Sequence, residues 1–214
     1  MLFRSAPLLR LGLVDALLGA EALSAPGRSL PEALARCQAE HPGLQWQLRT
    51  LRPQEIEREL LAGTLDAGVL AARPPVRGLE QHPLWDEPNQ LYAGPGHPWH
   101  GRGRRALDEA ELAGAVLVTD PYFDTGPAAE LLPASARAHA TRADSVEGVA
   151  LLVASGAAVG FLPEHLVQGQ PALRRLRPVW PARFAHTQRL VLACRAGKAG
   201  RPLRSLLRAL ALGT

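Results

Sequence analysis

One pair of histidines and one pair of cysteines are of residue types that bind metals or undergo redox reactions. Neither pair has the full sequence pattern that such a site needs. His97 and His100 are separated by two residues, but no cysteine or carboxylate cluster accompanies them, so a loop is expected instead of a metal site. Cys37 and Cys194 lack a Cys-x-x-Cys spacing and are expected to be buried, reduced thiols. Phosphate-binding Walker loops, Gly-x-Ser-x-Gly turns and Ser-x-x-Lys motifs are missing from the sequence. We therefore expect neither an enzyme nor a bound metal or cofactor.

The charged residues favour a globular protein over a nucleic-acid-binding domain. The 214 residues include 24 Lys and Arg against 20 Asp and Glu, a net charge of +4, and the arginines are scattered along the chain. The densest group, Arg102, Arg104 and Arg105, lies in a glycine-rich stretch and is interpreted as a solvated loop. Because we find neither a long apolar run nor a secretory signal in Met1–Leu9, we expect a cytoplasmic protein.

The elements that must position any binding residues alternate between strand and helix in the first part of the chain. Ser29 with Pro31 marks a helix start, and Gly63 marks a helix end. The alternation predicts an α/β fold with a mainly parallel sheet. The expected order is strand Leu9–Asp15, helix Ser29–His41, strand Leu44–Leu48, a helix from Pro53 to Gly63 and strand Leu65–Ala71.

A second α/β series follows, so the chain is expected to form two lobes. The pair Asp144 and Glu147 has the spacing of a capping box at the start of one helix. The expected elements are strand Leu91–Ala93, helix Leu107–Leu112, strand Ala115–Thr119, helix Ala128–Leu132, strand His139–Arg142, helix Ser145–Ala154, strand Ala157–Leu162, a helical turn Pro163–Val167, strands Leu176–Val179 and Arg189–Cys194, and a last helix from Pro202 to Leu210.

An ordered set of short segments covers nearly the whole chain and resembles the effector-binding domain of LysR-type transcriptional regulators. The most diagnostic segment is Leu60-Leu61-Ala62-Gly63-Thr64-Leu65-Asp66-Ala67-Gly68-Val69. Within it, Asp66 is interpreted as a structural hydrogen-bonding residue at the start of a strand, with a ligand contact as the alternative. Gly63 and Gly68 are interpreted as positions of tight turning and close packing. The other carrying segments are Leu9–Asp15, Leu30–Leu34, Glu40–Gly43, Gly78–Glu80, Pro83–Glu87, Gly96–Pro98 and Ser155–Pro163.

The resemblance implies the fold of type 2 periplasmic binding proteins, in which two Rossmann-like lobes are joined by two crossover strands. Lobe I would comprise residues 1–94 and 189–214, and lobe II residues 95–188. In such a fold the ligand lies in the cleft between the lobes, at carboxyl ends of strands and amino ends of helices.

The resemblance implies that twelve residues contact the effector, because of the positions they would occupy in the family's fold. They are Asp15, Ala16, Leu17, Thr50, Tyr122, Phe123, Asp124, Thr125, Thr141, Arg142, Asp144 and Phe161. For several of them a structural role is the alternative, such as a helix cap for Asp15 or core packing for Phe123.

Asp15 departs from many relatives, which have Ser or Thr near this point. With Asp120, Asp124 and Asp144 on the other lobe, an ionised Asp15 would repel a dianion. We therefore expect an effector with a cationic or hydrogen-bond-donating group, such as an amine or amino acid. Arg142 would either neutralise one carboxylate or bind an effector carboxylate.

The resemblance also implies partners. The family's winged helix-turn-helix and linker helix are expected to be absent from this chain, because the first strand begins by residue 9. DNA would then be bound only through that absent domain, under control of the effector, and no membrane partner is expected. Such domains commonly pair, so a homodimer is expected, with helices Ser29–His41 and Pro202–Leu212 as candidate surfaces.

Two other functions on the same fold stay open. A solute-binding protein of a transporter would need a signal or lipid anchor. A lyase similar to prephenate dehydratase would share Thr141-Arg142, but Ala143 stands where that family has Phe.

Overall fold

The chain folds into two units. A computed structural model describes residues 6–102 and 106–212. Within these residues, unit 1 consists of residues 6–17, 21–86 and 189–212, and unit 2 of residues 18–20, 87–102 and 106–188. Two long strands, β4 (Leu79–Ala93) and β9 (Ala185–Arg195), each contribute residues to both units.

Unit 1 contains most of the first half of the chain and its C-terminal helix. Besides the first part of β4 and the last part of β9, its elements are β1 (Leu8–Leu13), α1 (Leu30–Glu40), β2 (Gln45–Thr50), α2 (Pro53–Ala62), β3 (Ala67–Ala71) and α9 (Arg201–Ala209). The 3₁₀ turn η1 (Ala20–Leu23) also lies in unit 1 except for its first residue, which belongs to unit 2.

Unit 2 has shorter elements. They are α3 (Glu109–Ala113), β5 (Val118–Thr119), η2 (Phe123–Thr125), α4 (Ala128–Leu131), α5 (Ala134–Arg137), β6 (Thr141–Arg142), α6 (Val146–Ala154), β7 (Val159–Pro163), α7 (Glu164–Gly169), η3 (Pro171–Leu173), β8 (Arg177–Pro178) and α8 (Pro181–Phe184).

The three strands of the first strand-helix series pair in parallel as predicted, whereas the main sheet as a whole is mixed. Its strand order is β2-β1-β3-β9-β4-β7, and β8 also pairs with β4. β1 is parallel to β2 and β3, whereas β3–β9 and β4–β7 are antiparallel. The antiparallel pairs involve β4 and β9, the two strands with residues in both units. A separate parallel pair, β5 and β6, lies in unit 2.

β4 is longer than the predicted strand Leu91–Ala93. It runs for 15 residues and includes Pro83 and Pro88. Proline donates no hydrogen bond to a neighbouring strand, so a segment with two prolines lacks the usual sequence pattern of a strand.

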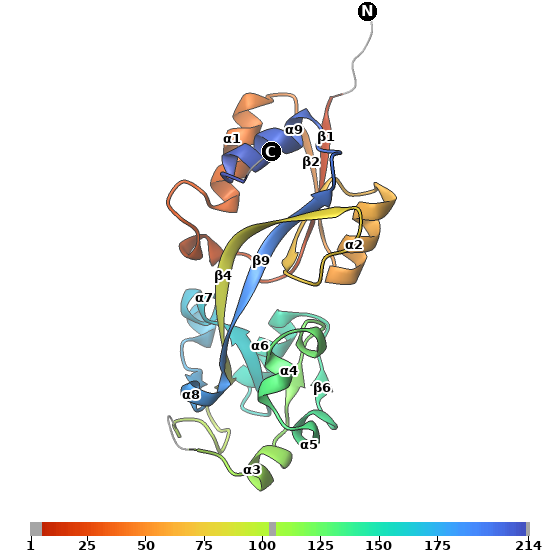
Figure 1. Cartoon of the computed structure of the whole chain (residues 1–214). Coiled ribbons are helices and arrows are strands. Elements are labelled where there is room, and N and C mark those ends of the chain that lie inside the picture. Colours follow the sequence, from red (N-terminus) through yellow and green to blue (C-terminus); the bar gives the residue numbers. More distant parts are fainter. Residues whose placement is uncertain (1–5, 103–105, 213–214) are drawn as a thin grey trace, which may run out of the picture. The chain divides into compact units, whose positions relative to one another are not determined.

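Successive side chains of a strand point to opposite faces of the sheet, and in unit 1 helices pack on both faces (Figure 1). Leu11 and Ala67 lie in a buried cluster with residues of α1 and α9, which pack against each other. The next residues along each strand, Gly12 and Gly68, lie against Ile56 of α2. The sheet of unit 1 is therefore covered by α1 and α9 on one face and by α2 on the other.

Close approach of α2 depends on the absence of side chains from these glycines. A Cβ atom on Gly68 would lie 2.2 Å from Cγ2 of Ile56, which is fully buried. Gly63 ends α2 with φ +77°, a left-handed conformation that glycine adopts without strain. The roles predicted for Gly63 and Gly68 are thus confirmed.

The N-terminal cap of α1 was predicted correctly, and that of α6 was predicted wrongly. Ser29 caps α1: the Glu32 N–H donates to Ser29 Oγ, and the Ser29 N–H donates to Glu32 Oε2. The capping box predicted for Asp144 and Glu147 is wrong, because the helix begins one residue later. Ser145 is the cap of α6, and its Oγ accepts a hydrogen bond from the Gly148 N–H.

Unit 2 has its own core. The buried cluster includes Leu91 and Ala93 of β4, Val159 and Phe161 of β7, and Phe184 of α8. Among the described residues, no helix is long and apolar enough to cross a membrane.

Candidate functional site

In unit 1 the implied contact residues lie at the carboxyl ends of β1 and β2. Leu13, the last residue of β1, is in register with Thr50, the last residue of β2. The Leu51 N–H donates to the Leu13 carbonyl at 2.9 Å, so the two strands stay paired up to this edge. Asp15 follows β1 by two residues and is half-buried, whereas Thr50 is exposed. The parallel register thus brings Asp15 and Thr50 to the same edge of the sheet.

The segment after β1 turns sharply. Ala16 has φ +56°, in the left-handed region that residues with a Cβ atom rarely adopt. Asp15, Ala16 and Leu17 are each half-buried. A strained residue at the end of a strand is common where backbone groups are presented to a ligand.

In unit 2, Asp120 shapes the loop that carries four of the implied contacts. Its Oδ1 accepts hydrogen bonds from the N–H groups of Tyr122 at 2.8 Å and of Phe123 at 3.0 Å. These bonds set the start of η2. Tyr122 is half-buried and Asp124 is exposed, while the side chain of Thr125 lies outside the part of the structure that can be described.

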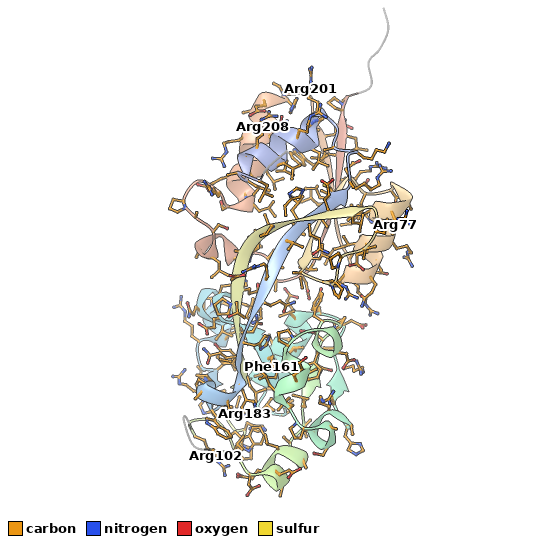
Figure 2. The ribbon with its side chains drawn as sticks, in the orientation of Figure 1. Arg77, Arg102, Phe161, Arg183, Arg201 and Arg208 are labelled. Atoms are coloured by element: carbon orange, nitrogen blue, oxygen red, sulfur yellow. The ribbon has the colours of Figure 1, made fainter. Side chains whose placement is uncertain are left out.

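Phe123 and Phe161 belong to the core of unit 2. They are 6% and 7% exposed, and their ring centroids are 6.3 Å apart. Figure 2 shows Phe161 among the side chains in the interior of this unit. The core-packing alternative for Phe123 therefore holds, and any ligand contact of these rings would be made by the small exposed part.

His186 was missed by the sequence analysis and lies against Phe161. The two ring centroids are 5.2 Å apart in an edge-to-face arrangement. Burial lowers the pKa of His186 to about 4, so the ring is neutral at physiological pH. Its Nδ1 has no hydrogen-bond partner among the described residues. The strand pattern around residue 186 had no feature that distinguished this histidine from an exposed one.

Thr141, Arg142 and Asp144 are exposed residues at the carboxyl end of β6 and in the segment before α6. Arg142 Nη1 lies 2.9 Å from Asp124 Oδ2, and both side chains are more than half exposed. This ion pair matches one of the two roles anticipated for Arg142, the neutralisation of a carboxylate. An exposed pair of this kind contributes little stability, about 0–1 kcal/mol, so a ligand could displace it at low cost.

Thr119 is a second residue that the sequence analysis missed. It is the last residue of β5, in register with Arg142, and it is 3% exposed. Its Oγ1 has no hydrogen-bond partner in the described structure. The only available signal was a hydroxyl residue directly before Asp120, at the end of a short predicted strand.

Other residues considered in the sequence have structural roles. Asp66 accepts hydrogen bonds from the backbone N–H of Arg10 at 2.8 Å and from its guanidinium, which confirms its predicted role at a strand entry. His97 Nδ1 accepts from the Trp99 N–H, and His100 Nε2 lies 2.9 Å from the Arg175 carbonyl oxygen. Arg102 pairs with Glu111, whereas Arg104 and Arg105 lie outside the described residues.

Both cysteines are buried and free of disulfide bonds, as predicted. Burial raises the pKa of the Cys37 thiol, and burial raises that of Cys194 to about 11. Neither thiol has the lowered pKa of a reactive cysteine.

The structure thus brings the implied contacts together in two sets. In unit 1, Asp15, Ala16 and Leu17 share an edge with Thr50. In unit 2, the loop after β5 and the end of β6 are joined by the pair Arg142–Asp124, and Phe123 contacts Phe161. Each set combines polar groups and backbone at strand ends, an arrangement that can bind a small polar molecule.

Comparison with known proteins identifies the family. The family model described as the LysR substrate binding domain matches residues 18–213. The chain is 33% identical over 181 residues to the HTH-type transcriptional activator BauR of Pseudomonas aeruginosa, covering 81% of this chain and 56% of BauR. It is 30% identical over 197 residues to the SDS degradation transcriptional activation protein of a Pseudomonas species, covering 87% of this chain and 63% of that protein. The chain therefore spans less than two thirds of the length of either relative.

Solved structures confirm the fold class. The regulatory domain of an OxyR2 variant from Vibrio vulnificus superimposes with a TM-score of 0.71 at 18% identity, over 99% of this chain and 97% of that one. The BenM effector binding domain with its effector benzoate gives a TM-score of 0.67 at 18% identity, over 96% and 90% of the two chains. The two-lobed fold of type 2 periplasmic binding proteins is thus confirmed. By its sequence and its fold, this chain belongs to the LysR substrate-binding domain family.

Proposed function

We propose that this chain is the effector-sensing part of a LysR-type transcriptional regulator that acts in the cytoplasm. The observation that carries the proposal is the family match over residues 18–213, together with 33% identity to a transcriptional activator. In the intact regulator, a bound small molecule would shift the population of conformations of this domain and so change DNA binding or transcription through a separate DNA-binding domain. The domain itself would carry out no reaction.

The effector is proposed to contact the two sets of residues described above. Asp15, Thr50 and the backbone around Ala16 form the contacts in unit 1. Those in unit 2 are Tyr122–Thr125, Thr141, Arg142, Asp144 and the exposed part of Phe161. Thr119 is added to this second set, because its buried hydroxyl lies at a strand end and has no protein partner in the described structure.

The charges of these residues favour an effector with a cationic or hydrogen-bond-donating group. Asp15 and Asp144 are acidic, and the charge of Asp124 is balanced by Arg142. An ammonium group interacts favourably with the half-buried carboxylate of Asp15 and with the exposed carboxylate of Asp144, whereas a dianion is repelled by both. Amines and amino acids are therefore the proposed effector class.

Calorimetric titration of the domain with amines, amino acids, aromatic acids and dicarboxylates tests this proposal. We expect an amine or amino acid to bind, and Asp15→Asn to weaken its binding at least about tenfold, since one charge-assisted contact contributes about 1.5–3 kcal/mol. Asp86→Asn is the matched control: Asp86 is an exposed carboxylate of unit 1, outside the proposed set, and pairs with Arg189.

Binding restricted to dicarboxylates would contradict the proposed effector class. Binding that survives Asp15→Asn unchanged would remove Asp15 from the site but leave the sensing function. Recovery of the bound compound chemically unchanged after prolonged incubation would distinguish a sensor from a lyase.

A homodimer is proposed to form through α1 and α9. The two helices pack against each other, and their inward residues, such as Cys37 and Leu206, are fully buried within unit 1. Their outward faces carry charged residues, among them Arg201 and Arg208, which Figure 2 shows on α9. Arg208 pairs with Glu40 of α1. Light scattering on Arg201→Glu/Arg204→Glu would show a shift toward monomer if these faces form the interface.

A further inference from the structure

Three side chains that differ in chemistry converge in unit 1, away from the residues proposed to bind the effector. Glu80 and His82 lie on β4, and Cys194 lies on β9, which neighbours β4 in the sheet. Residues two apart on a strand point to the same face, so Glu80, His82 and Leu84 share one face of β4. Leu84 packs against the buried cluster that contains Cys194. The face shared by Glu80 and His82 is therefore the one on which Cys194 lies.

The distances between the three possible ligand atoms are close to those in a tetrahedral metal site. Cys194 Sγ is 3.9 Å from His82 Nε2, and His82 Nε2 is 3.8 Å from Glu80 Oε2. All three atoms lie within 4.8 Å of one another. With Zn–S and Zn–N bonds of about 2.3 and 2.0–2.1 Å, tetrahedral geometry separates sulfur from nitrogen by about 3.6 Å. Small rotations of the side chains would thus be enough to bind the ion.

The three side chains differ in burial, so the cluster is closed by protein on the Cys194 side and open to solvent on the Glu80 side. Cys194 is 1% exposed, the side chain of His82 is 19% exposed, and that of Glu80 is 49% exposed. The sulfur is therefore held in the protein interior, whereas the carboxylate faces solvent. A metal ion could enter beside Glu80 and keep one position for water.

The carboxylate of Glu80 is also oriented by the backbone. The Gly197 N–H donates to Glu80 Oε1 at 3.2 Å, while Oε2 is the oxygen that approaches His82. A hydrogen bond to the non-coordinating oxygen is a common way of fixing a metal ligand in place.

We propose that Cys194, His82 and Glu80 form a binding site for Zn²⁺. The ligands would be Cys194 Sγ, His82 Nε2 and Glu80 Oε2, with water in the fourth position. The thiol proton is released to solvent as the S–Zn bond forms, and no oxidation or reduction takes place. Thiolate and imidazole favour zinc over Mg²⁺ and Ca²⁺, which prefer oxygen ligands only. The bound ion would link β4 to β9 within unit 1.

Metal titration of the full 214-residue chain, reduced and without an affinity tag, tests the proposal. We expect one equivalent of Zn²⁺ to bind in competition with a chromophoric chelator. Co²⁺ in its place should give a tetrahedral visible spectrum and a thiolate-to-cobalt charge-transfer band. Cys194→Ala should abolish that band and weaken Zn²⁺ binding by at least about tenfold, the lower end of what even outer-shell substitutions cost. His82→Gln should weaken binding similarly.

Cys37→Ala is the matched control, because Cys37 is a buried thiol of the same unit that contacts the Pro202 carbonyl and not this cluster. It should keep both the band and the affinity. If Cys194→Ala does not fold, as judged by circular dichroism, His82→Gln and Glu80→Gln at the more exposed positions decide the question. The proposal is overturned if the wild-type chain binds no Zn²⁺ stoichiometrically. It is equally overturned if these folded ligand variants bind as the wild type does, or if the band depends on Cys37.

Discussion

At the scale of single residues, His186 makes the stability of unit 2 dependent on pH. Burial lowers its pKa from 6.5 to about 4, so the folded state disfavours the charged ring that the unfolded chain accepts. The contribution of the neutral ring is fully present above the unfolded pKa and is lost as the pH falls through about 4. We therefore expect the stability advantage of the wild type over His186→Gln to shrink between pH 7 and pH 4, measured by urea denaturation.

Other groups titrate in the same acid range, so the comparison between the two proteins matters more than either curve alone. Hydrogen bonds from Arg189 lower the pKa of Asp86, which also removes stability at low pH. This loss is common to both proteins and cancels in the difference. A difference that stays constant over the range would show that His186 does not titrate as its burial requires.

Ser29 gives a second prediction at this scale. Its side chain and backbone exchange hydrogen bonds with Glu32, and these bonds lower the pKa of the Glu32 carboxyl. We expect Ser29→Ala to reduce the free energy of unfolding by about 1 kcal/mol, the usual cost of losing a helix cap. Ser135→Ala, at an exposed position of α5, should change it little. Equal urea midpoints for both variants would contradict the role of the cap.

At the scale of elements, the contact between α2 and the sheet depends on Gly68. A Cβ atom there would lie 2.2 Å from Ile56 Cγ2, closer than packed atoms can approach. We expect Gly68→Ala to destabilise the protein by about 1–3 kcal/mol, the typical cost of overpacking a core. Gly43→Ala is the control, because nothing lies within 4 Å of a Cβ atom at that position.

A double-mutant cycle separates this clash from general effects of the substitution. In an Ile56→Ala background the γ-carbon that obstructs the new methyl group is missing, so Gly68→Ala should cost less there than in the wild type. Additive effects of the two substitutions would mean that Ile56 does not limit the space at Gly68.

At the scale of the whole molecule, each unit has a core of its own, and protection from hydrogen exchange should follow the burial of the strands. β3 and β7 are buried at every residue, whereas β2 ends the strand order and is exposed at five of its six residues. We expect peptides from β3 and β7 to exchange slowest and those from β2 to exchange fast, by mass spectrometry. Slow exchange across β2 in the isolated domain would indicate that this edge is covered, for instance by a second copy of the chain.

Features that depend on local spacing could be predicted from the order of the amino acids. Apolar periodicity located α1, α2, α6 and α9, and the cap at Ser29 and the stop at Gly63 follow from side-chain and backbone preferences within a few residues. The family could also be identified from the sequence, because ordered glycine, proline and apolar positions extend along the chain. The twelve effector contacts stay predictions, since they were carried over by position.

Features that depend on pairing between distant segments became visible in the folded chain. β4 became a strand of 15 residues through its neighbours in the sheet, in spite of Pro83 and Pro88. His186 became a half-buried ring with a pKa lowered to about 4, because the fold places it against Phe161. The cluster of Glu80, His82 and Cys194 joins residues 112 positions apart. No local pattern reports such contacts, because they arise when burial of apolar surface brings separate strands together.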